Sequence, residues 1–315
     1  MNTLKKIAVC SRSFSRNEIL CSELKDKYKN VKFNSQGLSL NGESLIEFLK
    51  GATHTISALE KIDDDVLSNL PELEVISKYG VGLDMINMHA MKKYNIKLGW
   101  TGGVNRRSVS ELVISFAINL LRNVSESHRG VLKGDWSPYV GGQLTGRTVG
   151  IIGCGNVGKD LVKVLQPFGC KILVNDIKNY EDFYQKYNIK SVEKEELLSN
   201  SDIVTLHTPL DDSTQNMLSA ERMSLMKKDA ILINTARGNL INEEKLKQML
   251  LNGKLAGAAL DVFAIEPPED MELLKLSNFI VTPHIGGSSK EAILAMGRAA
   301  IDGIEINYDA SSFEP

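Results

Sequence analysis

The 315-residue chain is long enough for two domains, and its 43% hydrophobic and 24% charged residues are typical of a globular protein. Its formal net charge of −2 gives no overall attraction to nucleic acid or to an anionic membrane, so any ligand must be recognised by a local site. No stretch reaches the roughly 20 apolar residues of a membrane helix, and the start of the chain lacks the features of a secretion signal. We therefore expect a cytoplasmic protein that binds neither nucleic acid nor membrane.

Short apolar or β-branched runs alternate with helical patterns along the chain. The predicted strands are Ile7–Cys10, Val31–Phe33, Thr53–Ser57, Val75–Ser77, Thr148–Ile152, Lys171–Val174, Ile203–Leu206, Ala230–Ile233, Gly257–Leu260 and Phe279–Val281. Between them, the spacing of apolar residues predicts helices that include Glu18–Tyr28, Asp84–Tyr94, Gly158–Phe168 and Glu243–Leu251. This alternation, with continuous apolar strands, predicts an α/β fold of doubly wound parallel sheets covered by helices on both faces.

A loop signal near residue 100 divides the pattern into two domains. Trp100–Gly103 is followed by Ser108 and Glu111, which have the spacing of a capping box at the start of a long helix. We predict a first domain of residues 1–99 and a second domain of residues 100–286.

The C-terminal segment returns to the first domain. Its helical pattern, Lys290–Tyr308, is predicted to pack there, so that residues 287–315 complete a discontinuous domain. Two crossings between the domains would form a hinge with a cleft. The tail after Asp309 is expected to be frayed.

The four cysteines are Cys10, Cys21, Cys154 and Cys170, and they lack the paired spacing of metal ligands. Two lie in or beside apolar strands and one lies within a glycine loop. Buried thiols are therefore favoured over a metal site, and no metal is expected.

The segment TVGIIGCGNVG (148–158) is a strand followed by G-x-G-x-x-G and the start of a helix. Gly153, Gly155 and Gly158 would permit a tight turn, close approach of the backbone to a pyrophosphate, and close packing of helix on strand. The next strand leads to Asp176, 18 residues beyond Gly158, where a ribose-binding acid is expected. Its carboxylate would accept hydrogen bonds from the ribose of NAD and repel the 2′-phosphate of NADP. The alternative is an aspartate that only caps a turn.

Three later strands are each followed by a polar residue: Arg237, Glu266 and His284. In an open α/β sheet the carboxyl ends of the strands line the ligand site. Hydride transfer to a 2-keto acid needs a cation for the carboxylate and a proton donor for the carbonyl oxygen. Arginine supplies a bidentate fork, histidine supplies the proton, and a neighbouring glutamate would stabilise the imidazolium. Taken singly, Glu266 could be a solvated loop acid and His284 a structural histidine.

Together these patterns are recognisable: the chain resembles the D-2-hydroxyacid dehydrogenases, and among them the short D-3-phosphoglycerate-dehydrogenase-like members. The resemblance covers nearly the whole chain and rests on SKYGVGLDMIN (77–87), GRTVGIIGCGNVGKD (146–160), HTPL (207–210), LINTARGNLINEEKL (232–246), GAALDVFAIEPP (257–268) and VTPHIGGSSKEA (281–292). It implies that Arg237 orients the substrate, that His284 is the acid–base residue and that Glu266 supports this histidine.

The resemblance also implies further contacts and a fold for the first domain. The NAD contacts beyond the glycines and Asp176 would be Asn156, Val157, Thr208, Pro209, Thr235, Ala236, Asp261, Gly286 and Gly287. The substrate contacts would be Lys78, Tyr79, Gly80, Val81, Gly82 and Asn105, with the backbone N–H groups of the loop meeting the substrate carboxylate. The first domain would be flavodoxin-like. The protein would be a homodimer in which Gly99–Gly146, including Trp136, embraces the partner.

Two departures from the family pattern concern the substrate. The usual T-P-G is Thr101–Gly103 here, which affects only the stiffness of the loop before Asn105. The first domain has few cations for a substrate phosphate: Lys78 lies next to the loop, with Lys61, Arg106 and Arg107 as weaker candidates. The alternative for Lys78 is a solvated surface lysine.

The substrate prediction therefore keeps alternatives open. D-3-phosphoglycerate is the first substrate, and reduction of glyoxylate or hydroxypyruvate is the second. An NAD(H)-sensing module that binds proteins, like the corepressor relatives of the family, is the alternative from another class. A formate-dehydrogenase-like enzyme is disfavoured, because a glutamine would stand where Glu266 does.

Overall fold

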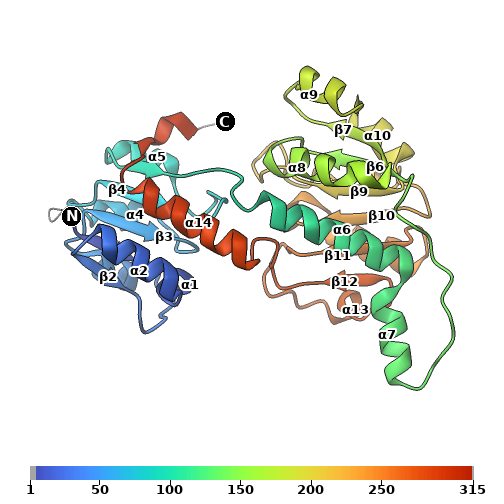
Figure 1. Cartoon of the computed structure of the whole chain (residues 1–315), viewed down its shortest axis with the longest axis horizontal. Coiled ribbons are helices and arrows are strands. Elements are labelled where there is room, and N and C mark those ends of the chain that lie inside the picture. Colours follow the sequence, from blue (N-terminus) through green and yellow to red (C-terminus); the bar gives the residue numbers. More distant parts are fainter. Residues whose placement is uncertain (1–4, 314–315) are drawn as a thin grey trace. The chain divides into compact units, whose positions relative to one another are not determined.

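The computed structural model describes residues 5–313 and divides into two compact units (Figure 1). Unit 1 comprises the chain up to Asn105 and from Ser289 onward, and unit 2 comprises Arg106–Ser288. The first boundary falls at the start of helix α6 (Arg106–Arg122) rather than at residue 99. Among the described residues, no helix combines the length and the apolar character that crossing a membrane would require.

Unit 1 is built on a six-stranded sheet in the order β13-β5-β4-β3-β1-β2. The strands are β1 (Ile7–Val9), β2 (Val31–Phe33), β3 (His54–Ser57), β4 (Val75–Lys78), β5 (Lys97–Gly99) and β13 (Tyr308–Asp309). The first five are parallel, and their order 2-1-3-4-5 is that of flavodoxin. Only β13 is antiparallel, and it pairs with β5 at the edge.

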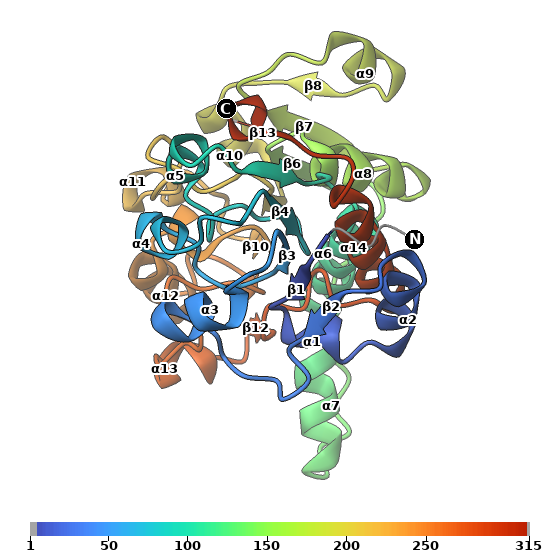
Figure 2. The same cartoon turned by 90° about the vertical axis from the view of Figure 1, so that its left-hand side faces the viewer.

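Helices cover both faces of this sheet. They are α1 (Arg12–Ser15), α2 (Glu18–Lys27), α3 (Gly42–Leu49), α4 (Asp64–Ser68), α5 (Met88–Lys93), α14 (Lys290–Gly303) and the 3₁₀ turn η3 (Ala310–Phe313). Figure 2 shows α2 and α14 on one face and α3, α4 and α5 on the other. Successive strand residues enter opposite cores: Ala8 joins the core with α3 to α5, whereas Ile7 and Val9 join the core with α2 and α14. This double burial explains the continuous apolar strands.

The C-terminal helix α14 completes unit 1 through very close packing. A Cβ on Gly99 would lie 2.1 Å from the carbonyl oxygen of Gly303, so the two backbones touch. Beside this contact, the buried Ser77 hydroxyl donates a hydrogen bond to the carbonyl of Ala300 (2.6 Å). Small residues on α14 therefore let it lie directly on β4 and β5.

Unit 2 is built on a seven-stranded parallel sheet in the order β12-β11-β10-β9-β6-β7-β8. The strands are β6 (Thr148–Ile152), β7 (Lys171–Asn175), β8 (Lys190–Ser191), β9 (Ile203–Leu206), β10 (Ile231–Asn234), β11 (Gly257–Leu260) and β12 (Phe279–Val281). The strand order reverses between β6 and β9, as in a Rossmann domain. Ligands bind at the carboxyl ends of strands at such a reversal.

Two hydrophobic cores lie on the two faces of this sheet. The helices are α6, α7 (Val124–Leu132), α8 (Asn156–Leu165), α9 (Glu181–Lys186), α10 (Lys194–Asn200), α11 (Ala220–Met223), α12 (Glu243–Leu251), α13 (Met271–Leu274), η1 (Gln166–Phe168) and η2 (Gly238–Leu240). Leu232 of β10 packs in the core with α10 to α13, whereas Ile231 and Ile233 pack in the core with α6 and α8.

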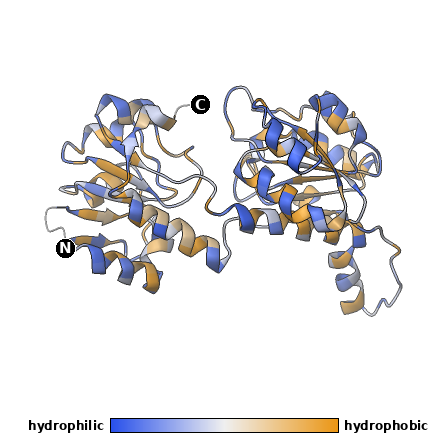
Figure 3. Ribbon diagram, turned by 45° about the horizontal axis from the view of Figure 1, so that its top comes forward, coloured by the Kyte–Doolittle hydropathy of each residue, from blue (hydrophilic) through white to orange (hydrophobic). Residues whose placement is uncertain are grey.

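Helix α7 differs from the other long helices because none of its residues is buried. Figures 1 and 3 show it projecting from the rest of unit 2. Leu132 at its end is 73% exposed. The segment that follows carries Trp136 and Val140, which are 85% and 92% exposed. This run of exposed apolar side chains is costly in water unless another surface covers it.

Several element boundaries differ from the sequence predictions. Helix α5 begins at Met88 rather than Asp84, because Asn87 caps it by accepting from the amide of Ala90. Helix α6 begins two residues before Ser108, which therefore lies inside the helix and is not its cap. Strands β5, β8 and β13 were not predicted, and the last two contain only two residues each.

The C-terminal end is more ordered than predicted. Helix α14 ends at Gly303 rather than Tyr308, and Tyr308 belongs to β13. Beyond it, the ring of Phe313 packs edge-on against Trp100 with centroids 5.6 Å apart. The expectation of a tail frayed from Asp309 onward is therefore wrong as far as Phe313, the last described residue.

The Gly99–Gly303 contact predicts the effect of a single added methyl group. Gly99→Ala forces two backbones apart, and we expect the free energy of unfolding to fall by about 1–3 kcal/mol, the usual cost of overpacking. Gly130→Ala is the matched control: Gly130 lies within α7 and its Cβ would make only ordinary contacts, the nearest at 3.8 Å. The control should be neutral or gain up to about 1 kcal/mol. Chemical denaturation compares them, and equal stability of the two variants would contradict this packing.

Candidate active site

The glycine loop after β6 has the geometry of a dinucleotide site. Gly153 adopts φ +97°, and a Cβ there would lie 2.5 Å from the carbonyl oxygen of His207. A Cβ on Gly158 would lie 2.1 Å from the carbonyl oxygen of Gly153, so helix α8 packs tightly on the loop. By contrast, a Cβ on Gly155 would meet nothing within 4 Å. The backbone at Gly155 is thus open to a phosphate group at the N-terminus of α8.

Asp176 follows β7 and lies beside this loop. Its Oδ2 accepts from the amide of Cys154 (2.5 Å) and its Oδ1 accepts from the amide of Lys178 (2.8 Å). The carboxylate therefore both caps a turn and ties that turn to the glycine loop. Each oxygen keeps a further lone pair, so the same group can accept hydrogen bonds from ribose hydroxyls.

A buried hydroxyl near the end of β10 supports the presence of a ligand. Thr235 is 9% exposed, and within residues 5–313 its Oγ1 has no hydrogen-bond partner. An orphaned buried hydroxyl costs about 1–3 kcal/mol. A polar ligand atom would remove that cost, so this residue and the open backbone at Gly155 both fit a bound dinucleotide.

His207 contributes no charge to this site. Burial lowers its pKa to about 3, and its Nε2 lies 3.0 Å from the hydroxyl of Thr205. The neutral ring at the end of β9 therefore lies against Thr205 and brings no charge to the glycine loop.

The turn after β10 sets the position of Arg237. The fully buried side chain of Asn234 accepts from the amide of Ala236 (3.0 Å) and donates to the carbonyl of Arg237 (2.7 Å). The guanidinium Nη1 donates to the carbonyl of Ala236 (2.7 Å). A Cβ on Gly238 would lie 1.9 Å from the carbonyl carbon of Phe263, so only glycine fits there. The turn that carries Arg237 therefore packs directly against Phe263, in the segment that follows β11.

Glu266 and His284 form a hydrogen-bonded pair. The Oε2 of Glu266 lies 2.9 Å from the Nδ1 of His284, and its Oε1 accepts from the amide of Phe263 (3.1 Å). The side chains are 41% and 48% exposed, so both are accessible to a ligand. A carboxylate at Nδ1 favours the tautomer with a proton there and leaves Nε2 for the substrate.

Asp261 holds the turn that carries His284. It is 1% exposed, and its Oδ1 accepts from the hydroxyl of Thr282 (2.5 Å) and the amide of Ile285 (2.7 Å). Its Oδ2 accepts from the amide of Gly286 (2.7 Å). His284 itself adopts φ +54°, an uncommon conformation for a residue with a side chain, and its amide donates to the carbonyl of Asp261 (3.0 Å).

All three predicted catalytic residues are thus anchored on the short segment 261–263. Arg237 is held through the contact of Gly238 with Phe263, Glu266 through the amide of Phe263, and His284 through Asp261. Strands β10, β11 and β12 are neighbours in the sheet, which brings their carboxyl ends together. This arrangement supplies a cation, a proton donor and a carboxylate at one edge of unit 2.

The predicted substrate loop lies at the carboxyl edge of the sheet in unit 1. Tyr79 is buried against Phe14, with ring centroids 5.5 Å apart, and its amide donates to the carbonyl of Ser57 (2.8 Å). Gly80 adopts φ +126°, which favours glycine. Lys78 is only 5% exposed and donates to the carbonyl of Ala58. The surface alternative for Lys78 is therefore wrong, and its role as a phosphate ligand stays a prediction.

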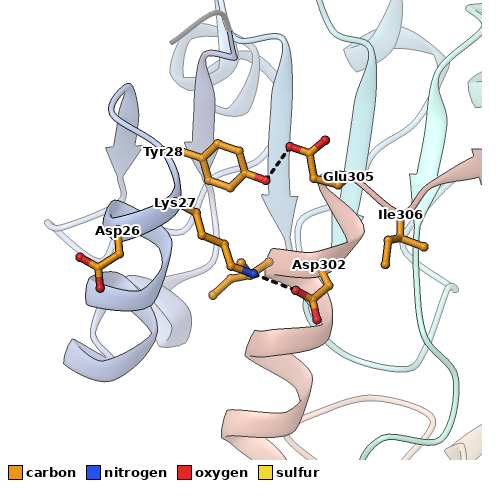
Figure 4. Close-up of a pocket in the computed structure, with 7 residues that line it drawn as sticks. Asp26, Lys27, Tyr28, Asp302, Glu305 and Ile306 are labelled. Atoms are coloured by element: carbon orange, nitrogen blue, oxygen red, sulfur yellow. Dashed lines mark hydrogen bonds and ion pairs between the residues drawn. The ribbon is translucent and has the colours of Figure 1, made fainter. Parts of the chain in front are cut away.

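A pocket in unit 1 is separate from the predicted site residues, none of which lines it. The volume of this cavity is about 460 Å³. Figure 4 shows two contacts at its wall: Tyr28 donates to Glu305 (2.9 Å) and Lys27 binds Asp302 (3.0 Å). The Lys5 ammonium holds the pKa of Glu305 below its ordinary value. These contacts join α2 to the end of α14. Among the described residues, no cluster of three or more His, Cys, Asp or Glu side chains could hold a metal.

Comparison with known proteins identifies the family. Residues 114–286 match the model of the D-isomer specific 2-hydroxyacid dehydrogenase NAD binding domain. The chain belongs to the D-isomer-specific 2-hydroxyacid dehydrogenases. The chain is 34% identical to the hydroxypyruvate reductase of Thermotoga maritima, in a match that covers 79% of this chain and 82% of that protein.

Two further proteins are similar to this chain, one in sequence and one in structure. The D-3-phosphoglycerate dehydrogenase of Methanocaldococcus jannaschii is 35% identical over 84% of this chain, which spans 52% of that protein. The D-lactate dehydrogenase from Lactobacillus jensenii, solved with NAD⁺, has a TM-score of 0.79 and 27% identity, with 95% of this chain and 96% of that chain covered.

The chain is therefore an NAD-dependent 2-hydroxyacid dehydrogenase with a Rossmann domain in unit 2. The open backbone at Gly155 and the unpartnered hydroxyl of Thr235 fit a bound NAD, and the contacts of the individual residues with it stay predictions. When bound, NAD supplies or accepts the hydride. The contacts of the predicted residues with ligands stay predictions. Two supports of the site, Asn234 and Gly238, were not predicted from the sequence, and Asp261 was expected to contact NAD rather than to hold the turn of His284. The one signal for them is their position directly at the ends of β10 and β11.

Asp176 predicts the choice of coenzyme. Burying a 2′-phosphate beside this carboxylate costs repulsion and desolvation, so we expect NAD(H) to be used with a clearly higher kcat/KM than NADP(H). Asp176→Ala should reduce that preference, because it removes both the ribose acceptor and the repulsion. Steady-state kinetics with both coenzymes test this. Equal efficiency in the wild type, or an unchanged preference in the variant, would contradict the role of Asp176.

Proposed function

We propose that this dehydrogenase interconverts D-3-phosphoglycerate and 3-phosphohydroxypyruvate with NAD(H). The observation that carries its chemistry is the 2.9 Å pair of Glu266 and His284, anchored beside the turn of Arg237. The substrate is supported by the likeness to D-3-phosphoglycerate dehydrogenases at 35% identity.

Each polar residue of unit 2 has a distinct task in this reaction. Arg237 binds the substrate carboxylate through its planar fork. The Nε2 of His284 donates a proton to the carbonyl oxygen during reduction and takes it back during oxidation. Glu266 holds the ring through Nδ1 and stabilises the imidazolium by its negative charge. The products of reduction are a hydroxyl group, a C–H bond and neutral His284.

The residues of unit 1 bind the rest of the substrate. Backbone N–H groups of the loop Tyr79–Gly82 meet the carboxylate, and Asn105 completes the set. Gly80 within this loop adopts a positive φ of +126°, a conformation that favours glycine.

Reduction of glyoxylate or hydroxypyruvate is the second candidate. The hydroxypyruvate reductase of T. maritima is similar over 82% of its own length. Unit 1 also offers few cations near its loop. A substrate without a phosphate would need only the carboxylate and carbonyl contacts.

A screen of NADH oxidation decides between the candidates. The keto acids are glyoxylate, pyruvate, hydroxypyruvate, phosphohydroxypyruvate and a branched 2-keto acid, each measured as kcat/KM. The first proposal requires phosphohydroxypyruvate to have the highest value. A higher value for glyoxylate or hydroxypyruvate would replace it with the second candidate, and no turnover of any keto acid would refute both.

The acid–base role of His284 predicts a large loss of turnover when its imidazole is removed. His284→Ala should lower kcat about 10²–10⁴-fold while NADH still binds. Steady-state kinetics together with a titration of NADH binding test this. A near-normal kcat in His284→Ala would contradict the assignment.

The assembly is a homodimer formed through the arm that includes α7. The exposed apolar residues Val131, Leu132, Trp136 and Val140 support this, because they are costly without a covering surface. The cytoplasmic location expected from the sequence also stays a prediction.

Charged substitutions on the arm test the dimer. Trp136→Glu with Val140→Glu should shift the sedimentation coefficient from dimer to monomer, because two charges would be desolvated at the interface. Ile177→Glu is the control: this residue is 99% exposed outside the arm. A wild type that sediments as a monomer would refute the proposal.

A further inference from the structure

Two buried charged side chains hold Ala58, the first residue after β3. Lys78 donates to the carbonyl oxygen of Ala58, and the Oε2 of Glu60 accepts from its amide (2.6 Å). We infer that Lys78 and Glu60 are positioning residues, which fix the loop after β3 against the substrate loop and so set substrate affinity. We name these three residues the Ala58 clamp. The inference rests on the proposed function of the loop Tyr79–Gly82.

Both charged side chains of the clamp are buried. Lys78 is 5% exposed and Glu60 is 8% exposed. Buried lysine and glutamate are rare unless they are paired or hydrogen-bonded, because each loses its hydration. Here opposite charges bind the two peptide groups on either side of one residue. The clamp therefore satisfies backbone polar groups and both charges together.

Apolar burial holds the loop only in part. Ala58 packs against the core and Ile62 is 1% exposed, but Leu59, between Ala58 and Glu60, is 73% exposed. The hydrogen bonds of the clamp therefore add to this packing in holding the turn. A change in either charged residue should loosen it.

The clamp is joined directly to the substrate loop. Lys78 lies opposite Ser57 in the parallel register of β3 and β4, and the amide of Tyr79 donates to the carbonyl of Ser57 (2.8 Å). A Cβ on Gly80 would lie 4.0 Å from the Cε of Lys78, so the lysine chain runs alongside the backbone of Gly80. Movement of Lys78 would displace the peptide groups that meet the substrate carboxylate.

This role differs from direct binding of a distal phosphate. A phosphate ligand affects only a substrate that carries the phosphate. A positioning residue affects every 2-keto acid, because all of them present the same carboxylate to the loop. Comparison of glyoxylate with phosphohydroxypyruvate therefore separates the two roles.

The test compares KM values of variants in the full-length enzyme. We expect Lys78→Met and Glu60→Ala each to raise KM for both keto acids by the same factor, about 10- to 100-fold, the usual cost of a displaced binding group. The KM for NADH should not change. Glu60→Gln keeps an acceptor for the Ala58 amide and should restore a KM close to the wild type. Lys50→Met is the control, since its ammonium is on the surface of the same unit (side chain 73% exposed).

Amide hydrogen exchange tests the clamp without any measurement of enzyme activity. The Ala58 amide should exchange faster in Glu60→Ala than in the wild type, and should stay protected in Glu60→Gln. This measurement also covers the case in which Lys78→Met does not fold. Wild-type enzyme that reduces no keto acid would refute the proposed function, whereas the exchange pattern would still report on the clamp.

Three results would overturn the inference. A rise in KM for phosphohydroxypyruvate alone would make Lys78 a direct phosphate ligand. Unchanged KM values for both keto acids in Glu60→Ala, with an active wild type, would show that the clamp does not position the loop. Equal exchange of the Ala58 amide in Glu60→Ala and Glu60→Gln would show that the hydrogen bond does not hold it.

Discussion

The buried carboxylate of Asp261 is the interaction on which the catalytic edge depends. It accepts three hydrogen bonds from the turn 282–286, at 2.5–2.7 Å, and so exchanges its lost hydration for charge-assisted bonds. That turn carries His284 in a left-handed backbone conformation, which costs about 1–3 kcal/mol unless its surroundings impose it. Without the carboxylate, the turn that carries His284 would lose these three hydrogen bonds, and the ring would no longer be held at Glu266. The strain at His284, the proposed acid–base residue, is thus offset by a side chain that does not need to touch the substrate.

The order of strands explains why three residues distant in the sequence meet. Strands β10, β11 and β12 are consecutive in the sheet, and each ends in the turn that carries one member of the group. Parallel strands place these turns at one edge, and the reversal of strand order at β6 and β9 places the glycine loop at the same edge. Close backbone contacts then fix the turns, since Gly238 allows the arginine turn to touch Phe263. Topology brings the groups near each other, and small residues set their final positions.

The sequence predicted most of this framework, because strands buried on both faces must be apolar throughout. Four strands of unit 2, from Thr148–Ile152 to Phe279–Val281, have the predicted bounds. Strands β8 and β13 escaped prediction because two exposed residues leave no apolar pattern. The burial of Lys78 could not be predicted either, since lysine is normally a surface residue and its partner, the carbonyl of Ala58, is 20 positions away. The support that Asp261 gives to the turn also depends on contacts between strands.

The two units anchor their polar groups by different means, and this difference bears on substrate choice. In unit 2 the polar side chains are fixed to the backbone of segment 261–263, so their geometry follows from the packing of the sheet. The groups they recognise, a carboxylate and a carbonyl, are common to all 2-keto acids. A distal group must therefore be distinguished by residues outside this set. In unit 1 the turn beside the substrate loop is held by two charged side chains and leaves Leu59 exposed, so its sequence can change without disturbing an apolar core. The Ala58 clamp acts on the carboxylate that all 2-keto acids share. We therefore expect differences in substrate among such enzymes to arise from exposed residues of this turn such as Leu59, while the clamp and the proposed proton-transfer residues stay the same.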